Sequence, residues 1–171
     1  MVPSTRRQLI TSMVTAFGAL ALRPRLSAAS QQQSKAAPDT ANRARTSLHQ
    51  EPSFKATPQR LYEILLDAKQ FAACTGAPAE IDPKAGGAFT LFGGLIVGRT
   101  VELIPNQRIV QAWRPTHWTE GVYSLVKFDL KPQASETTIV LDHTGFPEGD
   151  FDSLTSGWDS HYWQPLKKYL P

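Results

Sequence analysis

The sequence of 171 residues contains a single cysteine, Cys74, and no run of the roughly 18 apolar residues that a membrane-spanning helix needs. One cysteine excludes an internal disulfide framework and a cysteine-rich zinc site. Charged residues make up only 19% of the chain, and 13 prolines with 11 glycines argue against an all-helical bundle. The composition therefore predicts one turn-rich domain of the β or α+β class.

The familiar patterns of catalytic and metal sites are also missing. The four histidines are scattered and form none of the close pairs common in metal sites: His49, His117, His143 and His161. No Gly-x-Ser-x-Gly motif for a nucleophile occurs. Gly86-Gly87 and Gly93-Gly94 lack the lysine and the helical context of a phosphate loop, so they indicate turns. We therefore expect no catalytic residue, metal or cofactor.

Asp142 and His143 could be an acid–base pair, but they are neighbours on a predicted strand. Successive side chains of a strand point to opposite faces of a sheet, so the two should not line one site. Cys74, between a predicted helix and Thr75-Gly76, is more typical of a small buried hydrophobic residue than of a reactive thiol.

The formal charge of +3 comes entirely from the start of the chain. Residues 1–29 hold four arginines and no acidic residue, whereas residues 30–171 hold 14 basic and all 15 acidic residues. With no basic stripe interleaved with aromatic residues, the remainder is not expected to bind nucleic acid.

The first 29 residues have the three parts of an export signal. Arg6-Arg7 precede Leu9-Ile10, a mildly apolar run extends over residues 11–22, and small residues follow at 27–30. The arginine pair resembles that of a twin-arginine leader, which implies the twin-arginine translocase as a transport partner. We predict cleavage after Ala29 and a periplasmic or otherwise exported protein; a cytosolic amphipathic or disordered tail is the alternative.

Residues 30–45 are rich in glutamine, alanine and serine without apolar periodicity, which predicts a disordered linker. Residues 46–171 then form the folded domain. An edge strand is expected over 46–54, and Thr57-Pro58 is typical of a helix start. Apolar residues three or four apart predict a helix from there, and a second short helix is expected around 68–74.

Five further strands and one long helix complete the prediction. The strands are expected over residues 88–92, 95–104, 108–114, 121–130 and 137–144, and the short connections favour an antiparallel meander. Over residues 148–170 the apolar period becomes helical, with an apolar face formed by Phe151, Leu154, Trp158, Tyr162 and Leu166. Pro165 should kink this helix near its end.

Several segments carry a resemblance to a known family: residues 89–94, 98–103, 109–114, 121–124 and 157–170. They resemble the C-terminal domain of the activator of the ninety-kilodalton heat-shock protein ATPase. That domain belongs to the START-like, or SRPBCC, superfamily. The resemblance covers 46–171 and implies an α+β helix-grip fold. In this fold a curved antiparallel sheet of about six or seven strands surrounds a long C-terminal helix, with two short helices after the first strand.

The resemblance implies a cavity between the sheet and the long helix, and aromatic residues fall on the elements that should frame it. Such a cavity would bind a small hydrophobic or amphipathic molecule. The cavity candidates are Phe92, Trp113, Trp118, Tyr123, Trp158 and Tyr162. The alternative for each is ordinary core packing. Arg99 and Arg114 could meet an acidic head-group at the cavity mouth, or pair with a carboxylate such as Glu102.

Two other functions stay open. The first is a protein-interaction domain like the chaperone ATPase activator, although export would separate it from a cytosolic chaperone. The second is an enzyme of the cyclase or hydrolase type, which would need polar groups converging in the cavity. The candidates for that role are Glu80, Asp82, Tyr123 and Asp142.

Overall fold

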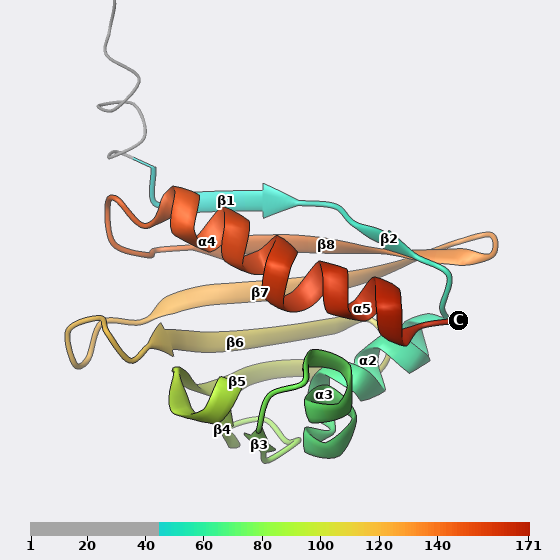
Figure 1. Cartoon of the computed structure of the whole chain (residues 1–171), viewed down its shortest axis with the longest axis horizontal. Helices are drawn as coiled ribbons and strands as arrows, with labels where there is room; N and C mark the ends of the chain where they lie inside the picture. Colours follow the sequence, from blue (N-terminus) through green and yellow to red (C-terminus); the bar gives the residue numbers. More distant parts are fainter. Residues whose placement is uncertain (1–44) are drawn as a thin grey trace, which may run out of the picture. The chain divides into compact units, whose positions relative to one another are not determined.

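The computed structural model describes residues 45–171; the predicted leader and residues 30–44 of the predicted linker lie outside this range. The described part is an α+β domain with one antiparallel sheet in the order β1-β8-β7-β6-β5-β4-β3, and β2 also pairs with β8 (Figure 1). Within residues 45–171 no helix is long and apolar enough to cross a membrane.

The elements follow the predicted order. They are β1 (Ser47–Gln50), β2 (Ser53–Phe54), α2 (Pro58–Leu66), α3 (Ala68–Thr75), β3 (Glu80–Ile81), β4 (Ala88–Leu91), a 3₁₀ turn (Phe92–Gly94), β5 (Ile96–Ile104), β6 (Arg108–Pro115), β7 (Ser124–Gln133), β8 (Glu136–Thr144), α4 (Phe151–Trp158), a π-helical turn (Asp159–Trp163) and α5 (Gln164–Tyr169). The two-residue strand β3 was not expected. At that length it carries too few residues to show an alternating pattern.

The predicted edge strand over residues 46–54 is interrupted and forms β1 and β2. Both segments pair with β8, and Pro52 lies between them. Proline has no N–H to donate to a ladder, but the Pro52 carbonyl still accepts from the Ile139 N–H at 2.9 Å. The two short strands therefore continue along the same edge of the sheet.

The two short helices begin at polar caps. The Thr57 hydroxyl accepts from the Arg60 N–H at 3.2 Å, with Pro58 in the first helical position, as the sequence predicts. Asp67 caps α3 by accepting from the Gln70 N–H at 2.8 Å. Helix α3 ends at Gly76, whose φ of +74° suits a residue without a Cβ.

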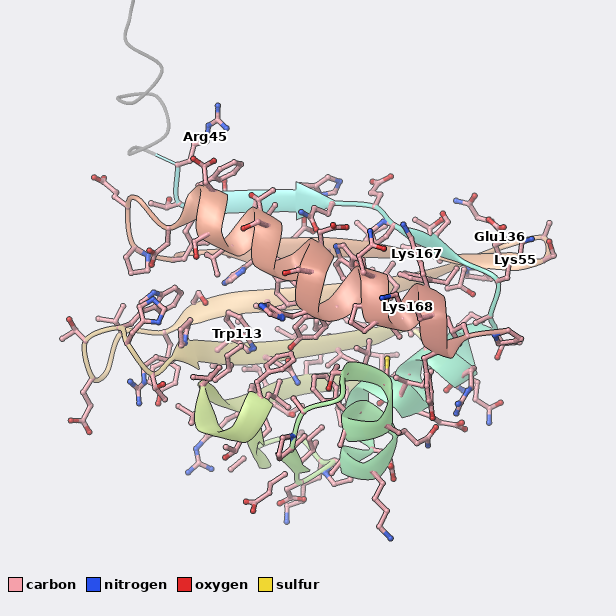
Figure 2. The ribbon with its side chains drawn as sticks, in the orientation of Figure 1. Arg45, Lys55, Trp113, Glu136, Lys167 and Lys168 are labelled. Atoms are coloured by element: carbon pink, nitrogen blue, oxygen red, sulfur yellow. The ribbon has the colours of Figure 1, made fainter. Side chains whose placement is uncertain are left out.

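The C-terminal helix is continuous and consists of α4, the π-helical turn and α5. It crosses one face of the sheet (Figure 1). Of the predicted apolar face, Leu154, Trp158, Tyr162 and Leu166 are buried and Phe151 is half-buried. The irregularity expected from Pro165 lies just before it, in the π-helical turn, where the Gln164 N–H donates to the Asp159 carbonyl. Lys167 and Lys168 are exposed in the last turn, where positive charge suits the helix dipole (Figure 2).

The core lies between this helix and the inner face of the sheet. Along β8, Leu141 and His143 are fully buried, whereas Asp142 between them is half-buried and bonds on the outer face. The two neighbours therefore point to opposite faces, as predicted. On β5, Gly98 packs against the Phe89 ring so closely that a Cβ at Gly98 would meet its Cζ atom at 2.3 Å.

Candidate functional site

A cavity of about 320 Å³ lies where the C-terminal helix meets β5, β6 and the 3₁₀ turn. Figure 2 shows Trp113, one of its wall residues, on β6 beside that helix. The lining residues are Phe92, Leu95, Ile96, Trp113, Pro115, Thr116, His117, Ser153, Leu154, Gly157, Trp158, His161 and Tyr162. None of them is Lys, Arg, Asp or Glu, so the wall is mainly apolar, with two histidines and a few hydroxyl groups.

Four of the six predicted cavity residues line this space: Phe92, Trp113, Trp158 and Tyr162. The other two do not. Trp118 is buried but lines a separate shallow hollow with Val122 and Phe146. Tyr123 is 47% exposed, and its ring lies under the Arg114 guanidinium at 5.8 Å. Both residues belong to the β6–β7 connection, where strand alternation does not decide which way a side chain points.

Several lining residues were not predicted from the sequence, although some of them carry a signal there. Leu154, Gly157 and His161 lie three or four residues apart from one another, on the helix face that also presents Trp158 and Tyr162. Helical spacing alone could have placed them. Thr116 and His117 follow the end of β6 in a connection with no periodicity, so nothing in the sequence indicates their place.

Phe92 forms part of the cavity wall in a strained backbone conformation. Its φ of +54° lies in the left-handed region, which bulky residues rarely adopt. The ring packs against Phe71 at 5.4 Å and against Tyr162 at 5.5 Å between centroids, and against His161 at 5.8 Å. These contacts hold the turn and offset a backbone cost of roughly 1–3 kcal/mol.

Three nearly parallel indole rings form the aromatic centre of the site. Trp158 stacks on Trp113 with centroids 5.4 Å apart and an interplanar angle of 20°. Trp158 also stacks on Trp163, with ring centroids 5.6 Å apart and an interplanar angle of 19°. Residues 158 and 163 are five apart, and the π-helical turn between them is what lets both rings face the core.

The three indole nitrogens of this stack differ in their partners. The Nε1–H of Trp158 donates to His143 Nδ1 at 3.1 Å, and that of Trp163 donates to Gln50 Oε1 at 2.5 Å. The Nε1–H of Trp113 is buried and has no hydrogen-bond partner among residues 45–171. Of the two indoles that line the cavity, Trp158 has an acceptor and Trp113 has none within the described part of the chain.

His143 is fully buried beneath the stack, and its bonds define its protonation state. An indole N–H only donates, so Nδ1 of His143 accepts from Trp158 and the hydrogen sits on Nε2. Nε2 lies 2.7 Å from Ser124 Oγ, and that hydroxyl donates to the Trp113 carbonyl at 3.0 Å. Burial lowers the pKa of His143 to about 3, so the imidazole is neutral and structural at physiological pH.

Tyr162 supplies a second neutral polar group on the cavity wall. Burial strongly raises the pKa of its phenol, and the nearby Trp113 indole opposes this shift without meeting hydrogen-bond geometry. The hydroxyl is therefore protonated over the whole physiological range. Tyr162 therefore gives the cavity wall a neutral hydroxyl that can donate or accept a hydrogen bond.

The four polar candidates for an enzyme do not converge. Asp142 lies on the outer face, with carboxylate oxygens 2.6 Å from His49 Nδ1 and 2.9 Å from Lys127 Nζ. Asp82 pairs with Lys84 at 2.9 Å, Glu80 is exposed on β3, and Tyr123 lies in the β6–β7 connection. None of the four lines the cavity, so the structure gives no basis for an acid–base reaction by them.

The two arginines suggested for the cavity mouth bond elsewhere. Arg99 donates to the Gly86 carbonyl at 3.1 Å, and Arg114 donates to the Trp118 carbonyl at 3.4 Å. Glu102 lies 3.5 Å from Arg108 instead. Cys74 is half-buried away from the cavity, and burial, opposed weakly by Arg60, raises the pKa of its thiol to about 11. The thiol is therefore protonated at neutral pH.

A curved antiparallel sheet that packs around a long C-terminal helix, with a cavity at their junction, defines a helix-grip protein of the START-like class. Residues 55–171 match the family described as "Activator of Hsp90 ATPase homolog 1-like protein". The chain belongs to this family.

Comparisons with individual proteins agree with the family assignment. An uncharacterized protein of Schizosaccharomyces pombe is 34% identical over 115 residues, 67% of this chain and 34% of that protein. Activator of 90 kDa heat shock protein ATPase homolog 1 of Homo sapiens is 27% identical over 116 residues, with 68% and 34% covered. The chain thus matches about a third of the length of these relatives.

A crystal structure of an Hsp90 activator from Plasmodium falciparum is also similar. It superimposes with a TM-score of 0.69 at 26% sequence identity, and the alignment covers 72% of this chain and 95% of that one. The likeness therefore extends over nearly the whole of that solved chain.

Proposed function

We propose that the domain binds a small apolar or amphipathic molecule in the cavity between β5, β6 and the C-terminal helix. The observation that carries the proposal is a cavity lined mainly by aromatic and aliphatic side chains, with no lysine, arginine, aspartate or glutamate in its wall. Small-molecule sites are typically concave and apolar, with a few polar groups that orient the ligand. A volume of about 320 Å³ is at the small end for such sites, which suits a compact ligand.

Gly157 offers a direct test of this site because it lines the cavity and has no side chain that packs against the core. A Cβ added there meets no atom within 4 Å, and glycine inside a helix costs roughly 1 kcal/mol relative to good helix formers. Gly157→Leu should therefore occupy the cavity while leaving the fold stable. Trp158 is unsuitable for this purpose, since its truncation would also leave His143 Nδ1 without a donor.

The experiment is a thermal-shift and calorimetric screen of neutral apolar compounds against residues 30–171 and the same protein with Gly157→Leu. We expect ligands that raise the unfolding temperature of the wild-type protein and have no effect on the variant. Equal stabilisation of both proteins would move the site away from the cavity. No stabilisation of the wild type by any compound would contradict the proposed function.

We also propose that residues 1–29 export the domain, on the basis of the arginine pair, the apolar run and the small residues that follow. Export would place the cavity in a compartment with periplasmic or extracellular molecules. It would also remove the domain from cytosolic ATP-dependent chaperones.

A second candidate function is activation of an Hsp90-type chaperone, which the family match and the names of the relatives favour. Those relatives are about three times as long as the matched region, so about two thirds of each relative has no counterpart in the alignment with this chain. Adding the purified domain to an Hsp90 ATPase assay tests it. Stimulation that survives Gly157→Leu would favour this function over cavity binding.

A further inference from the structure

The cavity between the sheet and the C-terminal helix is mainly apolar inside and mainly polar where it meets solvent. Its buried side chains include Trp113, Leu154, Trp158 and Tyr162. Its exposed side chains are Leu95 and four polar residues that we call the rim: Thr116, His117, Ser153 and His161. A molecule with an apolar body and one polar end suits such a site, because only the body has to leave water.

The rim offers positive charge and no negative charge. His117 follows the end of β6, and His161 lies in the π-helical turn. Histidine is the side chain that ordinarily gains or loses its charge between about pH 5 and 8. Among the described residues, no aspartate or glutamate lines the cavity. The rim therefore favours an anionic end on the ligand and disfavours a cationic end.

Both rim histidines are exposed and have aromatic neighbours. The His161 ring lies 5.8 Å from the Phe92 ring, and the His117 ring lies 6.2 Å from the Trp118 ring, between centroids. The ion pairs found within residues 45–171 include neither of the two. Their imidazole groups are therefore accessible to a ligand and are not neutralised by a carboxylate of the described chain.

The other titratable groups close in sequence to the rim either lie outside the cavity or stay neutral. Glu120 is in the same connection as His117, and Asp152 and Asp159 are on the C-terminal helix. None of these three carboxylates lines the cavity. Tyr162 does line it, but burial strongly raises the pKa of its phenol, so the hydroxyl stays uncharged.

From these observations we infer that the ligand is a small amphipathic carboxylic acid whose carboxylate is bound at the rim by His117 and His161. Its apolar body lies against the buried aromatic side chains. This inference rests on the proposed function and adds the charge of the ligand and the residues that recognise it. The two histidines take the role considered for Arg99 and Arg114, whose guanidinium groups bond elsewhere.

Recognition by histidine makes binding depend on pH in a defined direction. A carboxylic acid stays ionised above about pH 6, whereas histidine loses its positive charge as the pH rises toward 8. The affinity for a carboxylate should therefore fall between pH 6 and pH 8. The affinity for an uncharged analogue of the same shape should stay constant.

Three probes that share a naphthalene ring test the inference by calorimetry on the full-length protein. They are 2-naphthylacetate, its neutral amide 2-naphthylacetamide, and the cation 2-(2-naphthyl)ethylamine. At pH 6 we expect the acid to bind about threefold to tenfold more tightly than the amide, as for two exposed charge pairs, and the amine to bind most weakly. At pH 8 the acid and the amide should differ by less than about twofold.

Variants of the two histidines separate charge from shape. The double variant His117→Gln/His161→Gln keeps polar side chains at exposed positions, so it should fold and bind the acid and the amide equally at pH 6. His117→Lys/His161→Lys keeps the positive charge and should retain the preference for the acid at pH 8. His49→Gln is the matched control, because His49 is exposed but pairs with Asp142 and Glu51 on the outer face. Its preference should equal that of the wild type.

Equal binding of the acid and the amide by the wild type at pH 6, or tightest binding of the amine, would overturn the inference. A preference for the acid that survives in the double glutamine variant would overturn it too. Binding of the acid that persists in Gly157→Leu would place the anion outside the cavity, with the same consequence. If the acid fails while neutral apolar compounds bind in the cavity, the inference falls and the proposed function stands. Failure of every apolar compound would instead contradict the proposed function.

Discussion

The Nε1–H of Trp158 donates to Nδ1 of His143 across 3.1 Å, and this bond joins the helix to the inner face of the sheet. It sets the imidazole in its neutral form and places the Trp158 ring between Trp113 and Trp163. The polar chain continues through Ser124 Oγ to the Trp113 carbonyl. The wall of the cavity is therefore held in place by a buried, fully bonded network on one side.

The neutral state of His143 makes stability depend on pH. In the unfolded chain this side chain takes up a proton below its ordinary pKa of 6.5, whereas the folded pKa is about 3. Between these values the unfolded state binds more protons, so stability falls as the pH falls. We expect this residue alone to contribute a loss of about 1.4 kcal/mol per pH unit below pH 6.

Chemical denaturation of the wild type and of His143→Gln at pH 7, 6 and 5 measures this contribution. The variant should be less stable at pH 7, because Trp158 loses its acceptor, but its stability should decline less steeply. His49→Gln is the control with the opposite sign. Asp142 and Glu51 raise the pKa of His49, so its contribution is present at low pH and is lost as the pH rises. Parallel curves for wild type and His143→Gln would contradict a neutral His143.

Gly98 and Gly157 should respond in opposite ways to alanine. A Cβ at Gly98 would lie 2.2 Å from the Ala112 carbonyl oxygen and 2.3 Å from the Phe89 ring, so Gly98→Ala should cost about 1–3 kcal/mol or more. Gly157→Ala meets open space in a helix and should gain about 0.5–1 kcal/mol. Urea denaturation of both variants measures the two changes in unfolding free energy. Equal changes would contradict the close packing of β4 on β5 at Gly98.

On the outer face, Asp129 should matter more than its neighbour Glu102. Asp129 is largely buried and accepts from Arg108 Nε at 2.6 Å, with Lys127 at 3.3 Å. Burial alone would raise the pKa of Asp129, but bonds from Arg108 and Lys127 lower it below its ordinary value. Asp129→Asn should cost about 1 kcal/mol or more. Glu102 is half exposed and lies 3.5 Å from Arg108, so Glu102→Gln should change the unfolding free energy by less than about 0.5 kcal/mol.

Export through the twin-arginine route predicts a strict requirement for both arginines. Fractionation of cells that produce the full chain should place the processed domain in the exported fraction. Arg6→Lys with Arg7→Lys should retain the precursor in the cytosol, although the net charge is unchanged. The single change Arg23→Lys, outside the pair, serves as the control. Unaltered export of the double variant would exclude this route.

Much of the fold could be predicted because local chemistry and the final structure agree. The signals that predicted it each act over a few residues. They are the Thr57 cap with Pro58, the alternation along β6 and β8, and the spacing of Leu154, Trp158, Tyr162 and Leu166. The opposite orientation of Asp142 and His143 follows from strand geometry alone.

The remaining features depend on contacts between distant segments. Trp163 breaks the helical spacing, and only the π-helical turn and the acceptor on Gln50 explain its burial. Trp118 and Tyr123 lie in a connection whose path is set by packing rather than by periodicity. For the same reason the sequence could not show which of the core indoles lacks an acceptor.

The most direct measurement of the central claim is a ¹H–¹⁵N spectrum of the domain during titration with an apolar ligand from the screen. The four tryptophans give four indole signals, which report on Trp113 and Trp158 in the cavity wall and on Trp118 and Trp163 outside it. We predict the largest saturable shifts at the Trp113 indole and at the Gly157 amide, and their absence in Gly157→Leu. Shifts confined to the outer face of the sheet, or identical shifts in the variant, would contradict a ligand site between the sheet and the C-terminal helix.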